Sequence, residues 1–591
     1  MAALLLAGCG DQGRKHALPA SSSRGTEDKL IASALADAGR EGKTVTLAGA
    51  DTLHVGPSAL TFYRSRGWRS AWTDADGLTD PGKAVLAQLA RTWDDGLSPE
   101  RYHYSTIQRL ASMVQSARDD ATRASAGANL DLVVSEGFAR YADDLAGGTV
   151  DPKELGLEWH LPQEHAPKVQ ALQLLASGQS PTSIVASLRP HTVIYARMMS
   201  ALARYRQVAA RGGWSQVGTG AVANANMPAR DTTTNVATRH AAARGGRRES
   251  AVASNATGVV ASIRNRLMAG DDSTEAALAA AGRAAPDVMD ARLRQAVVHF
   301  QQRHDLPADG KPTKQTIAQM NVPVADRIRT LELNMDRWRW LPRDLGSFYV
   351  MVNLPAFKVD VMQGDSTVME QKVVVGKPGW TTPMFADRMV SLVVNPYWNV
   401  PKSIVAEELG PEMAKDPNYL AKHHFEQTSD GGYRQMPGPK NSLGLFKFQL
   451  TNDQDIYLHD TPAKDLFSKD DRDLSHGCIR LQDAHAMAVL IGQHEGISQE
   501  TIDAARASGQ NHVLDFKRPV PTYIMYFTAA VQPDGSIHYY PDVYGLDQRL
   551  QTLAPKLEGR PVDSTQVAQD SAMVADSIKR VKASHAGQST D

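Results

Sequence analysis

The stretch that decides the fold reads Ile-Tyr-Leu-His-Asp-Thr-Pro at residues 456–462 and, after a polar loop, Ser-His-Gly-Cys-Ile-Arg at residues 475–480. It brings two histidines close in sequence to Cys478, the only cysteine of the chain besides Cys9. A free thiol is only a few per cent thiolate near pH 7, so a cysteine nucleophile needs a nearby base or cation. His459 ends a predicted strand and lies 19 positions before Cys478. We therefore predict a hairpin-like return that holds the imidazole within hydrogen-bond reach of a bare, ionised sulfur.

The residues next to the thiol suit an acyl-transfer site. Gly477 lets the backbone turn tightly directly before Cys478, so the amides of these two residues can face a developing oxyanion. One such donor is typically worth about 10²- to 10³-fold in rate. The spacing alone does not choose between His459 and His476 as the base.

Two other interpretations of this stretch compete with the nucleophile. A lone cysteine is usually a buried, inert thiol. A metal site is the other interpretation, because the stretch holds four side chains of ligand type: His459, Asp460, His476 and Cys478. The chain has no Cys-x-x-Cys or His-x-x-x-His pair to support such a site, so we predict no metal and no cofactor.

The pattern resembles the L,D-transpeptidase family with a YkuD-type catalytic domain, whose signature is a histidine followed by Ser/Thr-His-Gly-Cys. Here the histidine is His459 and the motif occupies residues 475–478. The strings at residues 441–444 and at Lys447-Phe448 look like the large periplasmic branch of the family, which adds a scaffold and a peptidoglycan-binding module. The resemblance spans roughly residues 60–550 and implies an α+β multi-domain protein with a β-rich catalytic domain.

The resemblance also implies roles for the site residues. Cys478 is the nucleophile, His459 is the general base, and the carbonyl of Asp460 orients the imidazole. The other implied residues are His476 and Gly477 on the oxyanion side, and Tyr457, Ser475 and Arg480 for substrate binding. Many members of the family carry Asn two places after the cysteine, where this chain has Arg480. Whether Arg480 holds a substrate carboxylate or a structural partner therefore stays open.

The function implied by the resemblance is two-step acyl transfer on peptidoglycan stem peptides. Cys478 attacks the carbonyl after the third stem residue, D-alanine leaves, and a diaminopimelate amine of a second stem resolves the thioester as a 3-3 cross-link. The resemblance also implies acylation of the same sulfur by β-lactams of the carbapenem class. Two alternatives remain: a non-catalytic peptidoglycan-binding envelope protein, and a cysteine hydrolase that differs only in acceptor access.

Outward from the motif, the sequence divides into units of different periodicity. Alternation with a period of two predicts strands, and apolar residues at helical spacing predict helices. Leu293, Val297 and Phe300 share one helical face, and Thr313 can cap a following helix. The strings at residues 296–301 and 309–313 are similar to a peptidoglycan-binding-type helical module. The predicted organisation begins with a signal and tether at 1–55, a helical scaffold at 56–212 and a flexible insertion at 213–258. The module follows at 259–325. The catalytic domain at 326–555 contains a lid-like insertion at 401–440, and a disordered tail at 556–591 ends the chain. Predicted strands of the catalytic domain lie at 348–353, 357–361, 373–376 and 389–394.

The first nine residues, Met-Ala-Ala-Leu-Leu-Leu-Ala-Gly-Cys, resemble a bacterial lipoprotein signal. In that interpretation Cys9 carries the lipid and tethers the protein to a membrane facing the periplasm, so we expect a location in the cell envelope. The signal departs from the usual pattern because no Lys or Arg precedes Cys9.

The composition excludes two further classes. The 64 Lys and Arg residues against 65 Asp and Glu leave a formal charge of −1, which gives no electrostatic basis for a nucleic-acid partner. Two cysteines in 591 residues exclude a disulfide-stapled scaffold.

Overall fold

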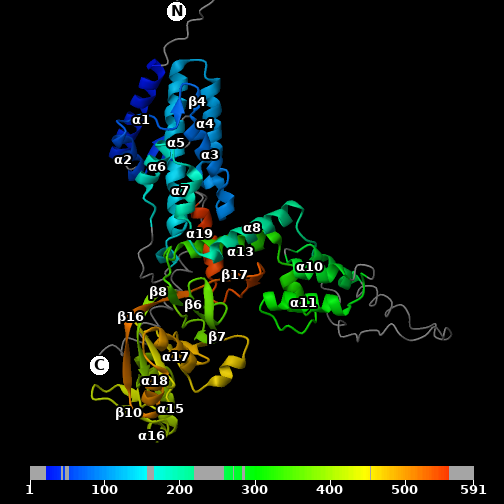
Figure 1. Cartoon of the computed structure of the whole chain (residues 1–591), viewed down its shortest axis with the longest axis vertical. Helices are drawn as coiled ribbons and strands as arrows, with labels where there is room; N and C mark the ends of the chain where they lie inside the picture. The colour runs from blue at the N-terminus through cyan, green and yellow to red at the C-terminus, as the bar shows by residue number, and fades with distance from the viewer. Residues whose placement is uncertain are drawn as a thin grey trace, which may run out of the picture. The chain divides into compact units, whose positions relative to one another are not determined.

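The computed structural model of the protein describes residues 21–41, 44–46, 52–155, 165–218, 258–270, 272–281, 286–452 and 454–557, which fall into two compact units (Figure 1). Cys9, residues 219–257 and residues 558–591 lie outside the described residues. The predictions of a lipid anchor, of most of the flexible insertion and of the tail therefore stay predictions. Within the described ranges no helix combines the length and the apolar character needed to cross a membrane.

The first unit is mainly helical, as predicted for the scaffold. Helix α3 begins where the Thr79 hydroxyl accepts a hydrogen bond from the Gly82 amide, a favourable N-cap. The unit contains α1 Ser21–Glu41, α2 Pro57–Ser65, α3 Asp80–Leu89, α4 Tyr104–Ser116, most of α5 Asp120–Gly147, α6 Lys168–Ala176 and α7 Pro181–Leu188. Two short hairpins pair β1 Thr44–Thr46 with β2 Thr52–His54, and β3 Thr73–Asp74 with β4 Gly77–Leu78.

A buried carboxylate organises this unit. Asp131 of α5 is fully buried and accepts hydrogen bonds from the Tyr63 hydroxyl and the Trp72 amide, both at 2.6 Å, and from the Thr73 hydroxyl at 2.8 Å. A buried carboxylate needs several donors to offset its desolvation. Asp131 thereby ties α2 and the β3–β4 hairpin to α5.

Helix α1 Ser21–Glu41 corrects part of the prediction of a signal and tether over residues 1–55. Ile31 and Leu35 are buried, and the buried side chain of Glu27 contacts the Thr73 hydroxyl. An amphipathic helix with buried apolar side chains is part of a folded core. Residues 21–41 therefore belong to the scaffold unit and are not a tether.

The second unit contains the predicted small helical module. Its helices span residues 258–268, α10 Ser273–Ala280, α11 Ala291–Arg303 and α12 Lys314–Met320. The predicted face of Leu293, Val297 and Phe300 is buried, and the Thr313 hydroxyl caps α12 by accepting from the Thr316 amide at 3.2 Å. Residues 213–218, predicted as the start of a flexible insertion, pack onto this module, because Val217 is in its core and the Trp214 ring lies 3.7 Å from the Arg266 guanidinium.

Three further helices of this unit and a large sheet form its main core. Helix α8 Val193–Ala210 packs against α13 Val324–Arg339, and α19 Leu546–Leu557 also contacts α13. The sheet has nine strands in the order β14-β7-β15-β13-β12-β8-β16-β5-β6. Their bounds are β5 Phe348–Asn353, β6 Lys358–Gln363, β7 Ser366–Gly376, β8 Phe385–Val394, β12 Phe446–Leu450, β13 Leu458–His459, β14 Asp473–Ser475, β15 Ile479–Leu481 and β16 His512–Met525. Beside the sheet lie η6 Lys464–Ser468, α17 Ala484–His494 and α18 Gln499–Ala507. The hairpin of β17 Ala529–Val531 and β18 Ile537–Tyr539 packs against α8, α13 and α11.

The four predicted strands of the catalytic domain are present, but β7 begins at Ser366 and β8 at Phe385, ahead of the predicted starts at 373 and 389. β6 begins at Lys358 because Phe357 has a positive φ of 50°, which interrupts an extended backbone. The predicted hairpin-like return is wrong, because β13 and β15 pair in parallel. The chain between them crosses over and adds β14 on the far side of β7 before it returns.

The predicted lid-like insertion is a small folded subdomain. It begins before the predicted bound of 401, because it includes β9 Trp398–Asn399. Its other elements are α14 Lys402–Ile404, the π-helical turn η5 Val405–Leu409, α15 Gly410–Lys415, α16 Tyr419–Lys422, β10 Phe425–Gln427 and β11 Tyr433–Gln435. Its strands form a separate sheet in the order β10-β11-β9, and Val400, Ile404 and Leu409 form its own apolar core.

Candidate active site

The sheet register aligns three functional side chains in one row. His459 on β13 is paired with Lys447 on the antiparallel strand β12 and with Arg480 on the parallel strand β15. Directly paired residues point to the same face of a sheet, and side chains two positions apart along a strand share that face. Tyr457 and Cys478 therefore lie on the same face as this row.

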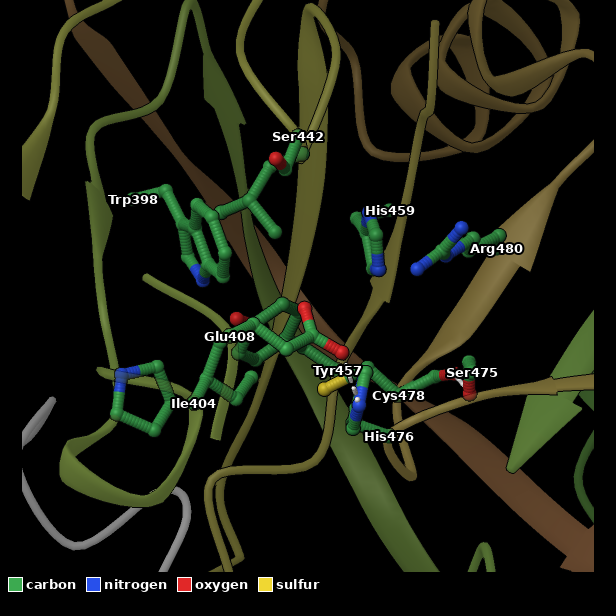
Figure 2. A pocket seen from close by; sticks show the side chains of 12 residues that line it. Trp398, Ile404, Glu408, Ser442, Tyr457, His459, Ser475, His476, Cys478 and Arg480 are labelled. Carbon is green, nitrogen blue, oxygen red and sulfur yellow. Dashed lines mark hydrogen bonds and ion pairs between the residues drawn. The ribbon is translucent and has the colours of Figure 1, made fainter. Parts of the chain in front are cut away.

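These side chains line one pocket with residues from the insertion. Figure 2 shows His459, Arg480 and Cys478 on one side of it and Trp398 and Ile404 of the insertion on the other. The cavity has a volume of about 130 Å³. Of the predicted site residues, those that line it are Tyr457, His459, Ser475, His476, Cys478 and Arg480.

His459 is held as a neutral base. Its Nδ1 donates a hydrogen bond to the backbone carbonyl of Asp460, which leaves the lone pair on Nε2. Burial, the Arg480 charge and the Lys447 charge lower the pKa of His459 to about 3, although the carbonyls of Asp460 and Leu443 favour the protonated ring. The predicted role of the Asp460 carbonyl agrees with this contact.

The Asp460 carboxylate lies behind the pocket and anchors that carbonyl. It accepts hydrogen bonds from the Leu445 amide at 2.9 Å and from the Lys464 ammonium at 2.7 Å. The Asp460 amide donates to the Phe446 carbonyl at 2.8 Å. Gly444 has a φ of 62°, and a Cβ at this position would overlap the Asp460 carboxylate. A glycine is therefore required for this close approach.

Cys478 is buried and protonated in the resting site. Its side chain is only 8% exposed, and the thiol faces the Asp455 carbonyl at 3.7 Å. Burial raises the pKa of Cys478 to about 11, opposed by hydrogen bonds from Tyr457 and by the charges of Lys447 and then Arg480. The raised pKa of Cys478 and the lowered pKa of His459 disagree with the predicted ionised pair, because desolvation disfavours both the thiolate and the imidazolium, while Cys478 does line the pocket.

The turn before Cys478 is closed by its own hydrogen bonds. Gly477 has a φ of 114°. Its amide donates to the Ser475 hydroxyl at 3.1 Å, and that hydroxyl donates to the Cys478 carbonyl at 2.6 Å. The Gly477 amide, expected to face an oxyanion, is thus engaged inside the turn. Ser475, expected to bind substrate, is buried and supports the turn.

A second set of hydrogen bonds supports the turn from the sheet. The Thr382 hydroxyl donates to the Gly477 carbonyl at 2.7 Å and accepts from the Gly376 amide at 2.9 Å. The Tyr544 hydroxyl donates to the Gly376 carbonyl at 2.6 Å and accepts from the Thr382 amide at 3.4 Å. Tyr544 and Thr382 are therefore positioning residues for the Cys478 turn.

His476 lies at the boundary between the motif and the insertion. Its Nε2 is 3.0 Å from the Glu408 carboxylate and 3.3 Å from the Lys377 ammonium, and its ring meets Trp380 edge to face. A backbone carbonyl orients His459, whereas the ring nitrogen of His476 lies next to Glu408 and Lys377. These contacts favour His459 as the base, a choice that the spacing alone could not make.

Sequence reasoning missed Lys447, Glu408, Thr382 and Tyr544. Lys447 lies on the less buried face of the alternating strand Phe446–Leu450, and its ammonium lies 4.1 Å from the centre of the Tyr457 ring. A lysine inside a strand next to the motif was the available signal. Glu408 and Tyr544 lie far from the motif in the sequence, and no local pattern links them to it.

One group of metal-ligand type occurs among the described residues outside the pocket. It consists of Asp272, Glu275 and His299. Arg303 already pairs with the Glu275 carboxylate at 2.8 Å and lies 3.6 Å from that of Asp272. The guanidinium supplies the positive charge that a cation would otherwise provide.

Three family models match separate parts of the chain. Residues 347–493 match the L,D-transpeptidase catalytic domain, residues 58–202 the scaffold domain, and residues 273–320 a domain described as "Putative peptidoglycan binding domain". Along the chain the scaffold match comes first, the peptidoglycan-binding match second and the catalytic-domain match third.

Individual proteins similar to this chain share the same description. A protein of Haemophilus influenzae named "Putative L,D-transpeptidase" is 29% identical over 242 residues, which are 37% of this chain and 48% of that protein. The chain thus spans about half the length of this curated relative. Among solved structures, L,D-transpeptidase 3 from Mycobacterium tuberculosis in complex with a faropenem-derived adduct is 13% identical with a TM-score of 0.17, covering 30% of this chain and 60% of that one. The Ldtfm-avibactam carbamoyl enzyme is 11% identical with a TM-score of 0.17, covering 34% and 63%.

Proposed function

We propose that this chain, which carries an L,D-transpeptidase catalytic domain at residues 347–493, forms 3-3 cross-links in peptidoglycan by acyl transfer through Cys478. The observation that carries the proposal is the parallel pairing of β13 and β15, because it puts His459, Cys478 and Arg480 on one face of the sheet and in one pocket. The orienting carbonyl of Asp460 on the His459 Nδ1 completes the arrangement of a nucleophile, a base and a group that orients the base.

In the first half-reaction the sulfur of Cys478 attacks the carbonyl after the third residue of a donor stem. Because the resting pair is neutral, His459 Nε2 takes the thiol proton as the C–S bond forms, and not before. Lys447, Arg480 and Tyr457 then favour the negative charge on sulfur as it develops. The C–N bond to the terminal D-alanine breaks, and the imidazolium returns the proton to the leaving amine.

The donor stem presents carboxylates, and Arg480 is suited to bind one. The Arg480 Nε is buried and has no hydrogen-bond partner among the residues that the structure describes. Its guanidinium lines the pocket next to Cys478. A guanidinium with an unused donor can form charge-assisted hydrogen bonds with a ligand carboxylate, so we assign Arg480 to a carboxylate of the donor. β-Lactams of the carbapenem class, which also carry a carboxylate, fit the same position.

In the second half-reaction an amine of a neighbouring stem attacks the thioester. A lipoprotein lysine is a variant of the same acceptor, and water in its place would make the protein a hydrolase. The match of residues 273–320 to a peptidoglycan-binding family supports peptidoglycan as the substrate polymer. With Cys9 as a lipid anchor, the protein would act in the cell envelope.

The proposal is tested with purified protein and disaccharide-tetrapeptide fragments of peptidoglycan. We expect released D-alanine and new 3-3 dimers, and a mass increase of the intact protein after treatment with a carbapenem. The Cys478→Ala variant should release no D-alanine, form no dimers and gain no mass with the carbapenem. It should keep the circular dichroism spectrum of the wild type. Dimers formed by the variant would refute the assignment of the nucleophile.

The same products separate the alternatives. Shortened monomers without dimers would indicate a hydrolase. Binding to purified sacculi without any labelling of Cys478 would indicate a non-catalytic peptidoglycan-binding protein.

A further inference from the structure

The pocket at Cys478 contains a single carboxylate. Among the described residues that line it, Glu408 is the only acidic side chain. Arg480 lines the same pocket, Lys447 lies on the other side of His459 in the same row, and Lys377 lies beside His476. A further cation that enters this pocket is therefore repelled by these three cations and, among the described lining residues, attracted by the carboxylate of Glu408 only.

The insertion presents Glu408 through a widened helical turn. In η5 the Gly410 amide donates to the Val405 carbonyl, five residues earlier, which is the hydrogen-bond pattern of a π-turn. Ile404 and Leu409 on either side of Glu408 are buried in the core of the insertion. The turn is thus anchored by its apolar neighbours, and Figure 2 shows the Glu408 side chain reaching toward His476 and Cys478.

Glu408 is oriented and charged, yet it stays accessible. His476 Nε2 lies 3.0 Å from its Oε1, and the Glu408 side chain is 54% exposed. The hydrogen bond with His476 and the nearby positive charges hold the pKa of Glu408 below its usual value. At neutral pH it is therefore a carboxylate, held at one oxygen, with surface left for a ligand.

We propose that Glu408 binds the acceptor amine of the second stem and places it over the Cys478 thioester. The proposal rests on the acyl transfer proposed above and names the residue that selects the acceptor. An alkyl amine such as the side-chain amine of diaminopimelate is an ammonium at neutral pH. A carboxylate accepts charge-assisted hydrogen bonds from such a group, whereas water, the competing acceptor, gains nothing from the charge.

Atoms and charge are conserved in this step. The bound ammonium loses one proton to water, and the Glu408 carboxylate keeps an N–H hydrogen bond to the resulting amine. The amine nitrogen attacks the thioester carbonyl, so a C–N bond forms and the C–S bond breaks. His459 takes the second proton from nitrogen and returns it to the departing sulfur. The products are one amide, one free thiol and one proton in solution.

The test measures how much of the acyl-enzyme is resolved by the acceptor amine and how much by water. The full-length protein is incubated with disaccharide-tetrapeptide, and dimers and tripeptide monomers are quantified at several acceptor concentrations. We expect Glu408→Gln to lower the ratio of dimers to hydrolysed monomers at least tenfold and to raise the acceptor concentration for half-maximal dimer formation. Glu408→Asp, which keeps the charge, should recover part of the ratio.

Glu407→Gln is the matched control, because Glu407 is the exposed neighbour in the same turn and does not line the pocket. It should leave the ratio unchanged. A wild-type ratio for Glu408→Gln, or an equal loss in Glu408→Gln and Glu407→Gln, would overturn the inference. If the wild-type protein forms no acyl-enzyme at Cys478, both the proposed function and this inference fail. If Glu408→Gln is acylated and still forms dimers at the normal ratio, only this inference fails.

Discussion

His459 and Arg480 are register partners on the parallel strands β13 and β15, so an imidazole and a guanidinium stand side by side in the pocket. Lys447 occupies the corresponding position on the other side of His459. A proton on His459 would therefore lie between two cations, which explains why this histidine is neutral at rest. The same two cations favour charge on the sulfur of Cys478. One row of side chains thus keeps His459 unprotonated and opposes the rise in the pKa of Cys478 that burial causes.

The first prediction concerns pH. Because the pKa of Cys478 is raised to about 11, its thiolate fraction increases with pH over the whole range below that value. The rate of alkylation by iodoacetamide should rise about tenfold per pH unit between roughly pH 7 and 10, without a plateau. With a His459 pKa of about 3, no inflection from histidine is expected between pH 5 and 8. A plateau already below pH 7 would show a thiolate–imidazolium pair at rest and contradict the neutral site.

The second prediction concerns Lys447. Of the two cations that lower the pKa of Cys478, Lys447 has the larger effect. Lys447→Met removes the charge with little change of volume, so alkylation of Cys478 at pH 8 should slow by about tenfold, the equivalent of one pKa unit. Lys447→Arg keeps the charge and serves as the control. Equal slowing in both variants would mean that Lys447 acts through packing.

The third prediction concerns Gly444. A Cβ there would displace the Asp460 carboxylate and, through it, the carbonyl that orients His459. Gly444→Ala should reduce carbapenem acylation by about 10²-fold, as misplacement near the chemistry does elsewhere, measured by intact mass over time. Gly431→Ala is the control, since Gly431 also has a positive φ of 84° but no atom within 4 Å of the added Cβ. Similar losses in both variants would point to backbone strain alone.

The fourth prediction concerns Tyr544. Tyr544→Phe removes the hydroxyl that links Gly376 to Thr382 beneath the Cys478 turn. Loss of such a buried hydrogen bond costs about 1 kcal/mol of stability, and the acylation rate should fall several-fold because the turn is less well held. Tyr397→Phe, at an exposed tyrosine, is the control. The idea fails if the melting temperature falls while acylation keeps its wild-type rate.

The fifth prediction concerns Arg480. If its guanidinium binds a donor carboxylate, Arg480→Gln should raise KM for the tetrapeptide donor at least about tenfold, the value of one charged hydrogen bond. A donor amidated at that carboxylate should bind wild type and variant alike. Arg506→Gln, which alters an exposed ion pair on α18, is the control. An unchanged KM with a lower melting temperature would make Arg480 a structural residue.

The sequence by itself determined the features that depend on near neighbours in the chain. The motif at residues 475–478 identified Cys478 and His459 as candidates, alternation predicted the strands, and Thr313 was recognised as a helix cap. These signals are local, because side-chain alternation and capping act within a few residues.

Only the tertiary structure decided the features that depend on register and burial. The parallel pairing of β13 with β15, the row of Lys447, His459 and Arg480, and the contact between Glu408 and His476 join segments that are far apart in the chain. The neutral state of Cys478 and His459 follows from desolvation, which is a property of the whole packed pocket. A motif can name a nucleophile, but which strands lie beside it, and how much water reaches it, are set by the assembled fold.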